Sequence, residues 1–389
     1  MEISLEKKIQ QEVIVFNTRK IAEIQLVLTE ILYVPNEKLK LIIILELLDY
    51  LKDKFSKPDY KIEFAYTKEG NTITGFVVCQ IDTDFKSYGM KCPSFGWLHA
   101  KDFRSCELIM NECEDFVRRN KFRKIRGPIN LPKTIGGIGF QTEGFEAPML
   151  SGVAFNEPNS RILEYLEELG YKKDSKYSCV EVPQTNWKKG NTLDKNLIMR
   201  FLPLNEIRKL RSEILSLAQS SFHSVLADAL GGYSRFEEFM ESYKHLYGEG
   251  VEIKKELDQS SYSSIPEFIE MWESIDFNNI VPCCDMAFDR TTGELVGIIM
   301  AFPNLFQLWS GEPVTHLNID TVIIKKEYAG RGIFSSLHNV GQLTCRLYGY
   351  DYLEGTTIWA NNDRAVKTIF PHCKQVRTHY VVQKRILRK

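Results

Sequence analysis

The chain has 389 residues, more than a single domain usually contains, so its length predicts two domains. A hydrophobic fraction of 43% and a charged fraction of 26% are typical of a soluble globular protein. The formal net charge of −1 provides no overall attraction to nucleic acid or to an anionic membrane. We therefore expect neither DNA nor a membrane as a partner.

The N-terminal sequence and the cysteines favour the cytoplasm. Residues 1–18 lack the basic start and the unbroken apolar stretch of a signal peptide. The nine cysteines are an odd number without a Cys-x-x-Cys pair, so we expect neither a disulfide framework nor a metal site. Cys79 and Cys179 lie among apolar residues, where cysteine packs as a small hydrophobic side chain. A reducing cytoplasm is the expected location.

Strand and helix patterns alternate along the first half. Residues 39–51 are apolar but interrupted by charges, which predicts a buried amphipathic helix. The patterns that follow predict a hairpin, a strand, a helix and another strand, at 61–82, 94–101, 105–120 and 123–131. A polar stretch rich in Asn and Lys, 183–196, then separates two predicted domains, 1–185 and 196–389.

The second half repeats this order. Its patterns predict, in chain order, a strand, three helices, a hairpin, a strand, a helix, a strand, a short helix and a last strand, at 197–203, 205–222, 235–247, 265–275, 283–302, 316–324, 332–349, 351–360, from Asp363, and 378–386. The segments FRKIRGPINL and YDYLEGTTIW both follow an amphipathic helix and both carry a glycine in mid-strand. The two halves are therefore predicted to be a degenerate repeat.

The segment EYAGRGIFSSL, residues 327–337, is the most informative motif. It joins the strand 316–324 to the helix 332–349 through a Gly-x-Gly turn. Such a turn lets backbone N–H groups converge on an anion at a helix N-terminus. Because Ser335 stands where a dinucleotide-binding motif would have its third glycine, and because no Walker pattern is present, we do not expect dinucleotide or ATP binding.

In this setting the motif resembles the core of the GNAT superfamily, the GCN5-related N-acetyltransferases. The segment TVIIKKEYAGRGIFSSL is preceded by a hairpin and followed by YLEGTTIWA and by NNDRAVKTIF, which contains the family's Asn-x-x-Ala marker at Asn362 and Ala365. The first half, with IRGPINL and GFQTEGFEAPML, resembles the N-terminal part of bacterial and archaeal tandem GNAT proteins, the YghO-like proteins. The resemblance implies an α+β fold of two GNAT-like domains, each a mixed, mostly antiparallel sheet flanked by helices.

The resemblance also implies which residues bind coenzyme A. The pyrophosphate cradle would be the turn and the first residues of the helix: Ala329, Gly330, Arg331, Gly332, Ile333, Phe334 and Ser335. The strand backbone of Val322, Ile323 and Ile324 would pair with the pantetheine arm, and Asn362 would contact that arm. The sequence departs from the family pattern at Ala329, where Arg or Gln is preferred, and at Phe334, where Gly or Ala is preferred.

Catalytic residues are less directly indicated. The family's frequent glutamate base aligns with Asn318, and its tyrosine acid aligns with Ile369, so neither role carries over. Strand alternation predicts that His316 and Asp320 share a face with Asn318, which makes them candidates for the base that removes the amine proton. Each also fits an ordinary structural role, His316 at a solvent-facing strand end and Asp320 as a hydrogen-bonding side chain.

The first half is predicted to lack a phosphate cradle. Its strand-to-helix turn, residues 100–108, has no glycine that could adopt positive φ at low cost. The glycine-rich segment 134–145 precedes no recognisable helix start, so we interpret it as a loop or a strand bend. This half is expected to shape the acceptor pocket.

Together these features predict an acyltransferase that uses acetyl-CoA or another acyl-CoA, without a metal, and acts on a small-molecule or peptide amine. Two alternatives stay open at this level, a non-catalytic CoA-binding or ligand-sensing module and an aminoacyl-tRNA-dependent transferase. Acceptor identity, acyl length and oligomeric state are not specified by the sequence.

Overall fold

The computed structural model describes residues 12–184, 194–221, 226–230, 233–243 and 280–387. The helix expected at 265–275 lies outside these residues, as does most of the predicted boundary segment 183–196.

A single mixed sheet of 13 strands runs through both halves of the molecule. Its order is β1-β2-β3-β6-β7-β16-β9-β15-β14-β13-β12-β10, with β8 paired to β16. The first half supplies β1 (Val13–Thr18), β2 (Lys61–Glu69), β3 (Thr72–Ile81), β6 (Ser94–Ala100), β7 (Lys124–Gly127), β8 (Phe140–Glu143) and β9 (Lys172–Glu181). The second supplies β10 (Leu197–Pro203), β12 (Ile280–Asp289), β13 (Leu295–Pro303), β14 (His316–Ile324), β15 (Tyr352–Trp359) and β16 (Lys374–Arg385).

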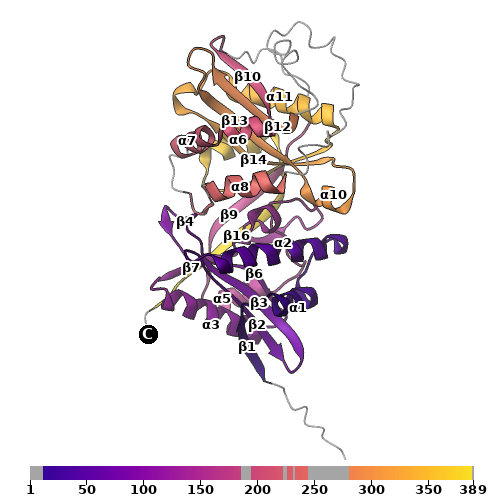
Figure 1. The fold of residues 1–389 in the computed structure, drawn as a ribbon, viewed down its shortest axis with the longest axis vertical. Coiled ribbons are helices and arrows are strands. Elements are labelled where there is room, and N and C mark those ends of the chain that lie inside the picture. Colours follow the sequence, from indigo (N-terminus) through magenta and orange to yellow (C-terminus); the bar gives the residue numbers. More distant parts are fainter. Residues whose placement is uncertain (1–11, 185–193, 222–225, 231–232, 244–279, 388–389) are drawn as a thin grey trace, which may run out of the picture.

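The two halves exchange strands where they meet. β16, from the end of the chain, lies between β7 and β9 of the first half, and β9 lies beside β15 of the second half. Figure 1 shows β9 and β16 at the middle of the molecule, with the indigo first half below and the orange second half above. The predicted halves therefore share one sheet, since each is completed by a strand from the other.

The internal repeat is confirmed by the sheet topology. In each half an antiparallel run leads to a helix and then to a parallel strand: β6 pairs with β7, and β14 with β15. The remaining strand pairs of the described sheet are antiparallel, as the sequence predicts for an α+β fold.

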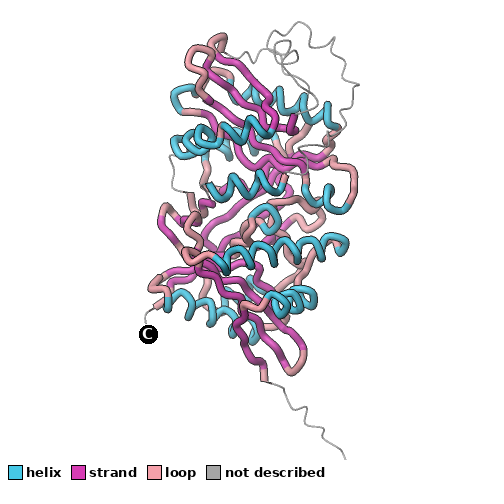
Figure 2. Tube along the Cα trace, viewed as in Figure 1, coloured by secondary structure: helices cyan, strands magenta, loops and turns pink. Residues whose placement is uncertain are grey.

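Helices cover both faces of the sheet (Figure 2). In the first half these are α1 (Ile21–Ile31), α2 (Glu37–Ser56), α3 (Phe103–Arg119), the one-turn α4 (Lys133–Gly136) and α5 (Ile162–Glu168). In the second they are α6 (Leu204–Lys209), α7 (Arg211–Ser221), α8 (Tyr233–Ser242), α10 (Leu305–Ser310), α11 (Ile333–Tyr348) and α12 (Asp363–Ile369), with short 3₁₀ turns η3 (Lys326–Tyr328) and η4 (Phe370–His372). A separate small sheet joins β4 (Phe85–Ser87) and β5 (Met90–Lys91) to β11 (Ala229–Leu230).

Alternating strand residues bury opposite faces of the second half's sheet. Ala287 packs with Leu337 of α11, whereas its neighbour Met286 packs on the other face with Ile214 of α7. The two cores place α11 and α7 on opposite sides of β14. Within the described residues, no helix is both long and apolar enough to cross a membrane.

Three expectations about local structure need correction. The strand predicted at 123–131 ends at Gly127, because Pro128 has no N–H to continue a ladder. The helix predicted at 205–222 is two helices, α6 and α7, that meet at Leu210. Cys79 of β3 is bonded to Cys113 of α3, with their Cα atoms 5.8 Å apart, rather than free. The apolar sequence around Cys79 predicts its burial but does not reveal which residue of the helix above it will face it.

Candidate functional site

The parallel strands β14 and β15 separate part-way along their length. They pair from His316 opposite Tyr352 to Ile319 opposite Gly355 and no further. Beyond Ile319, β14 stays bonded to β13 on its other edge. The edge of β14 that follows Ile319 therefore faces a fork in the sheet, where another extended chain could add its hydrogen bonds.

A β-bulge at Asp320 marks the start of this fork. Ile319 pairs with Ala301 and Thr321 pairs with Met300, so Asp320 is an extra residue on its strand. A bulge interrupts the two-residue alternation that predicted a common face for His316 and Asp320. It directs the Asp320 side chain independently of the rest of the strand.

The Gly-x-Gly turn lies at the open end of the fork. Gly330 and Gly332 have φ of 82° and 79°, the left-handed region that favours glycine. Ala329, Gly330 and Arg331 are exposed, and α11 begins directly after them at Ile333. An exposed turn at the N-terminus of a 16-residue helix has the geometry of an anion cradle.

Arg331 is held at the rim of this turn by two neighbours. Its guanidinium carbon lies 4.7 Å from the centre of the Tyr328 ring. Its Nη1 atom lies 3.8 Å from the Asp194 carboxylate, and its carbonyl accepts a hydrogen bond of 3.3 Å from the Asp194 N–H. Because the Arg331 side chain is 42% exposed, the charge remains accessible to a ligand in solvent.

A cavity of about 370 Å³ lies on the α11 side of the fork; we call it the donor-side cavity. Phe334, Ser335 and His338 line it from the first turns of α11. Ile333, by contrast, is buried against the sheet. The bulky Phe334 therefore faces the cavity rather than the protein core.

A larger cavity of about 650 Å³ lies on the α7 side; we call it the acceptor-side cavity. Asp320, Ile323 and Asn362 are among its second-half residues. Four residues line both cavities: Ile319, Val322, Gly355 and Ile369. The two cavities thus meet at the fork, where these four residues belong to the walls of both.

The acceptor-side cavity is built from both halves of the chain. Lys133 of α4 reaches it from the first half, and its Nζ lies 2.9 Å from Oδ1 of Asp320. The Thr321 hydroxyl donates to the other carboxylate oxygen of Asp320, at 2.9 Å. Lys133 and Asp320 have side chains only 7% and 9% exposed, so a nearly buried ion pair forms part of the cavity wall.

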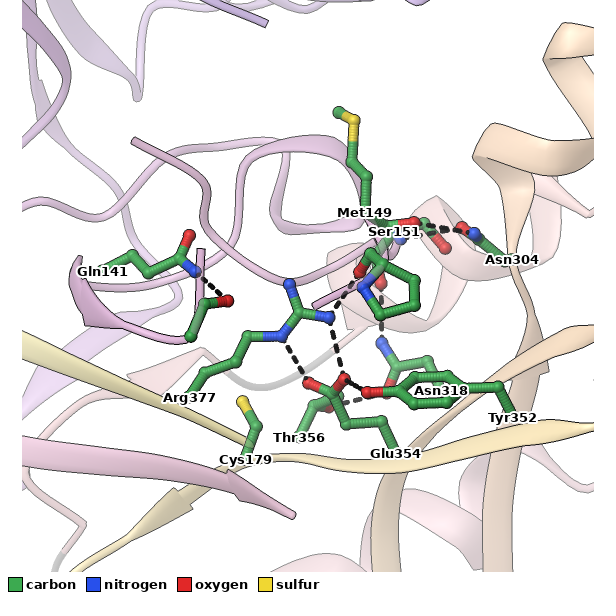
Figure 3. A network of polar contacts seen from close by, with 12 residues as sticks. Gln141, Met149, Ser151, Cys179, Asn304, Asn318, Tyr352, Glu354, Thr356 and Arg377 are labelled. Atoms are coloured by element: carbon green, nitrogen blue, oxygen red, sulfur yellow. Dashed lines mark hydrogen bonds and ion pairs between the residues drawn. The ribbon is translucent and has the colours of Figure 1, made fainter. Parts of the chain in front are cut away.

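Asn318 fixes the first half against this wall. Its side-chain N–H donates to the Ser151 carbonyl at 2.7 Å, and its oxygen accepts from the Thr356 hydroxyl at 2.6 Å (Figure 3). The neighbouring Gly152 N–H donates to the carbonyl of Thr134 in α4, at 2.7 Å. Asn318, which stands at the position of the family's glutamate base, therefore has a positioning role that extends to the helix carrying Lys133.

A buried ion pair joins the exchanged strand β16 to β15 next to this contact. Arg377 donates through Nε and Nη2 to the two oxygens of Glu354, at 2.9 and 2.8 Å, and also to the Pro148 carbonyl (Figure 3). The Tyr352 hydroxyl donates to Glu354 as well, at 2.6 Å. With Asn304 bonded to Met149 and Ser151, the second half holds residues 148–151 at several points.

The structure does not bring His316 to the fork. His316 lies beside the ring of Tyr352, with 5.2 Å between ring centres, and it lines neither cavity. Burial lowers its pKa below the ordinary histidine value. Of the two sequence candidates for the base, only Asp320 faces a cavity.

The remaining candidates lie around α12 and the turn. Asn362 caps α12 by accepting from the Ala365 N–H at 3.3 Å, and both residues line the acceptor-side cavity. Ile369, which the sequence comparison aligned with the tyrosine of the GNAT pattern, lies at the point where the cavities meet. Tyr328, whose hydroxyl bonds to Asp289 at 3.0 Å, and Tyr380 line neither cavity, so neither compensates for Ile369 there.

The sequence did not predict the first-half residues of the site, which include Lys133 and Tyr177. Tyr177 lines the acceptor-side cavity and donates to Asp228 at 2.8 Å. Lys133 stands 187 positions from Asp320 in the sequence, and no local pattern connects them.

The glycines of that segment serve close packing. A Cβ atom on Gly137 would lie 2.1 Å from the backbone nitrogen of Ala154. Gly137 and Gly139 have positive φ and form a bend between α4 and β8, so the predicted bend is present, but the segment 134–145 also contains most of the one-turn helix α4, which was not predicted. Among the described residues, no group of three or more His, Cys, Asp and Glu side chains is arranged to hold a metal ion.

No protein-family model and no curated protein matches this sequence. Solved structures do resemble it. A tandem GNAT protein of the clavulanic acid biosynthesis pathway aligns over 97% of this chain and 100% of its own length, with a TM-score of 0.51 and 9% identity. A conserved protein of Enterococcus faecalis V583, described as a probable N-acyltransferase, aligns over 96% of this chain and 73% of its own, with a TM-score of 0.51 and 9% identity.

A third similar structure is the GCN5-related glucosamine N-acetyltransferase region of a fungal multi-domain GH3 β-N-acetylglucosaminidase. It aligns over 96% of this chain with a TM-score of 0.54 and 11% identity, and this chain spans 38% of its length. The fold expected from the sequence is thereby confirmed as that of two tandem GNAT modules.

Proposed function

We propose that the second half of this chain, which has the fold of two tandem GNAT modules, binds an acyl-CoA and transfers its acyl group to an amine. The observation that carries the proposal is the fork between β14 and β15, where one edge of β14 pairs with no strand among the described residues and two cavities meet. The Gly-x-Gly turn stands at the same end of β14 as this free edge. One site thus offers an anion cradle, an edge for an extended arm and a passage between two faces of the sheet.

Each part of CoA has a matching surface in this arrangement. The turn from Ala329 to Gly332, whose first three residues are exposed, and the N-terminus of α11 suit the pyrophosphate. The backbone of Val322, Ile323 and Ile324 suits the amide groups of the pantetheine arm. The donor-side cavity would take the arm on the α11 side, with Phe334 and Ser335 in its wall.

Asp320 is positioned to act as the general base of the transfer. The amine nitrogen would attack the thioester carbonyl, forming the C–N bond as the C–S bond breaks. A carboxylate in the acceptor-side cavity can accept the proton that the amine loses, and the thiolate of CoA gains one proton, so that acyl-CoA and amine give amide and free CoA. Lys133 holds the carboxylate at the fork through its 2.9 Å contact.

Calorimetric titration of the full chain with CoA and acetyl-CoA tests the donor site. The variant Gly332→Asp should lose binding at least 100-fold, since it adds a negative charge and a strained positive φ where phosphate would lie. The matched control is Gly311→Asp, at another glycine of positive φ, which is exposed at the C-terminal end of α10. Retained affinity in Gly332→Asp, or equal loss in both variants, would place the CoA site elsewhere.

A second function, CoA binding without transfer, is favoured by one specific observation. Asn318 and Ile369 occupy the positions of the family's base and acid, and Asn318 is fully engaged in bonds to Ser151 and Thr356. Release of free thiol from acetyl-CoA across a panel of amines separates the two functions. A sensing module would bind CoA and release no thiol above the hydrolysis rate.

A further inference from the structure

We infer that the acceptor is a free α-amino acid with an apolar side chain, recognised through its zwitterionic head group by Lys133 and Asp320. This inference rests on the proposed acyl transfer and names the acceptor for it. It follows from three features of the acceptor-side cavity: two opposite charges side by side in its wall, a buried carboxylate, Asp228, that is matched within the protein, and walls that are otherwise mainly apolar.

The Lys133–Asp320 pair presents opposite charges side by side. The Lys133 ammonium and the Asp320 carboxylate lie 2.9 Å apart, and both line the cavity. An α-amino acid carries the complementary charges on groups separated by a single carbon atom. Its ammonium can bind Asp320 while its carboxylate binds Lys133, so each buried charge keeps an opposite partner after the ligand enters.

The second carboxylate in the wall, Asp228, is already matched within the protein. Asp228 accepts from Nε and Nη2 of Arg126, at 2.8 and 2.9 Å, and from the hydroxyls of Ser175 and Tyr177. Asp228 is completely buried in this network, and Arg126 is too. A ligand would have to break four hydrogen bonds to use Asp228.

The rest of the cavity suits an apolar side chain. Ile214 and Ala218 of α7, Met300 of β13, and Ile358 and Trp359 of β15 line it. A volume of about 650 Å³ lies within the range of small-molecule sites and exceeds what a single amino acid fills. Burial of an apolar side chain here would supply affinity, and the ionic head group would supply orientation.

Binding in this orientation places the amine beside the proposed base. The amino acid's ammonium loses one proton before attack, and Asp320, which it contacts, can accept the second as the C–N bond forms and the C–S bond breaks. One of the two protons ends on the thiol of CoA and the other is released to solvent. The product is an N-acyl amino acid. Lys133 contacts only the acceptor's carboxylate, so it is a specificity-determining residue.

The test compares ligands that differ only in the carboxylate. Into the full chain saturated with CoA we would titrate L-phenylalanine, L-phenylalaninamide and 2-phenylethylamine. L-Phenylalanine should bind about 10- to 100-fold more tightly than the other two, as expected for charge-assisted hydrogen bonds to a carboxylate. L-Leucine should also bind, and L-glutamate should bind more weakly than either.

Variants separate recognition from folding. Lys133→Met should remove the advantage of L-phenylalanine over its amide, while Lys133→Arg should keep it. Lys384→Met is the matched control, because it breaks a lysine–carboxylate pair with Glu114 that lies outside both cavities. If Lys133→Met fails to fold, Lys133→Arg still tests the inference, because a purely structural role would predict no difference between the ligands in any variant.

The outcomes distinguish a failure of the acceptor inference from a failure of the proposed donor site. Equal affinity for the three ligands, or no binding of L-phenylalanine and L-leucine to a chain that binds CoA, overturns the inference and leaves the proposed transferase intact. Carboxylate-dependent binding in a chain that does not bind CoA supports the amino acid site and contradicts the proposed donor. Carboxylate-dependent binding that survives in Lys133→Met places recognition on another residue and overturns the inference.

Discussion

The two halves have the same strand order but differ at the place where their parallel strands separate. In the first half β6 and β7 pair only at Ser94 and Arg126, and the chain then fills the gap between them. The Ile129 N–H donates to the Phe95 carbonyl at 2.8 Å, and the Trp97 N–H donates to the Asn130 side chain at 2.6 Å. In the second half the corresponding fork opens into two cavities.

The helices that follow these strands differ in the same way. In the first half Asp102 caps α3, and its carboxylate accepts from the Ser105 N–H at 2.7 Å, where an anion would otherwise bind. In the second half the exposed Ala329, Gly330 and Arg331, followed by Gly332, precede α11. One scaffold therefore supplies a filled module and an open one, and the filled module contributes Lys133 to the cavity of the other.

The largest stability difference should come from two equivalent glycines, Gly127 of β7 and Gly355 of β15. A Cβ atom on Gly127 would lie 2.4 Å from the Phe95 carbonyl, whereas on Gly355 its nearest neighbour is a Val180 methyl at 3.3 Å. Gly127→Ala should destabilise the protein by about 3 kcal/mol, and Gly355→Ala by less than about 1 kcal/mol. Thermal unfolding of both variants provides the measurement.

Equal shifts in melting temperature for the two variants would mean that the forks are packed alike. That result would remove the structural basis for assigning the donor to one half only.

The interface of each helix with the sheet offers a second comparison. Under α3 the buried side chains are mainly apolar, but under α11 Asp285 is fully buried without a hydrogen-bond partner, next to Gly341. Burial raises the pKa of Asp285 well above its ordinary value. The folded protein thus keeps a proton that the unfolded chain releases near pH 4, and this part of its stability is lost as pH rises from there.

Asp285→Asn should therefore stabilise the protein by about 1–3 kcal/mol at pH 8 and have little effect near pH 4. Denaturant unfolding of wild type and variant at several pH values measures the difference. A gain that is constant with pH would contradict the assignment of a buried, unpaired carboxyl group.

The smallest effect is expected at the filled helix terminus. Asp102→Ala removes the cap of α3 and should cost about 1 kcal/mol of stability. It should leave CoA affinity unchanged, because the donor is assigned to α11. A change of more than about threefold in CoA affinity, measured by titration, would implicate the first half.

Most of the fold of the second half could be predicted from local sequence patterns. The Val- and Ile-rich strand 316–324 coincides with β14, and the helix predicted at 332–349 is α11 within one residue at each end. Both segments have strong periodicity and a glycine turn between them, which are local signals. The exchange of β9 and β16 has no such signal, because it depends on which edges remain unpaired once both halves have formed.

Only those parts of the site that are formed by residues close together in the sequence could be predicted from the sequence. The turn and Asn362 follow from motif spacing, but the bulge that turns Asp320 toward a cavity is invisible to a rule of strict alternation, and this rule wrongly grouped His316 with it. Lys133 joins Asp320 through tertiary packing, by way of Ser151 and Asn318. Contacts between distant segments are set by the assembled sheet rather than by any neighbouring residues.

Hydrogen exchange of the full chain with and without CoA tests the central claim most directly. CoA should slow exchange at the backbone amides of residues 320–324 and 330–336, at a stoichiometry of one per chain. The equivalent amides of the first half, 94–107, should exchange at unchanged rates. Protection at 94–107, or a stoichiometry of two, would contradict the account of one open and one filled module.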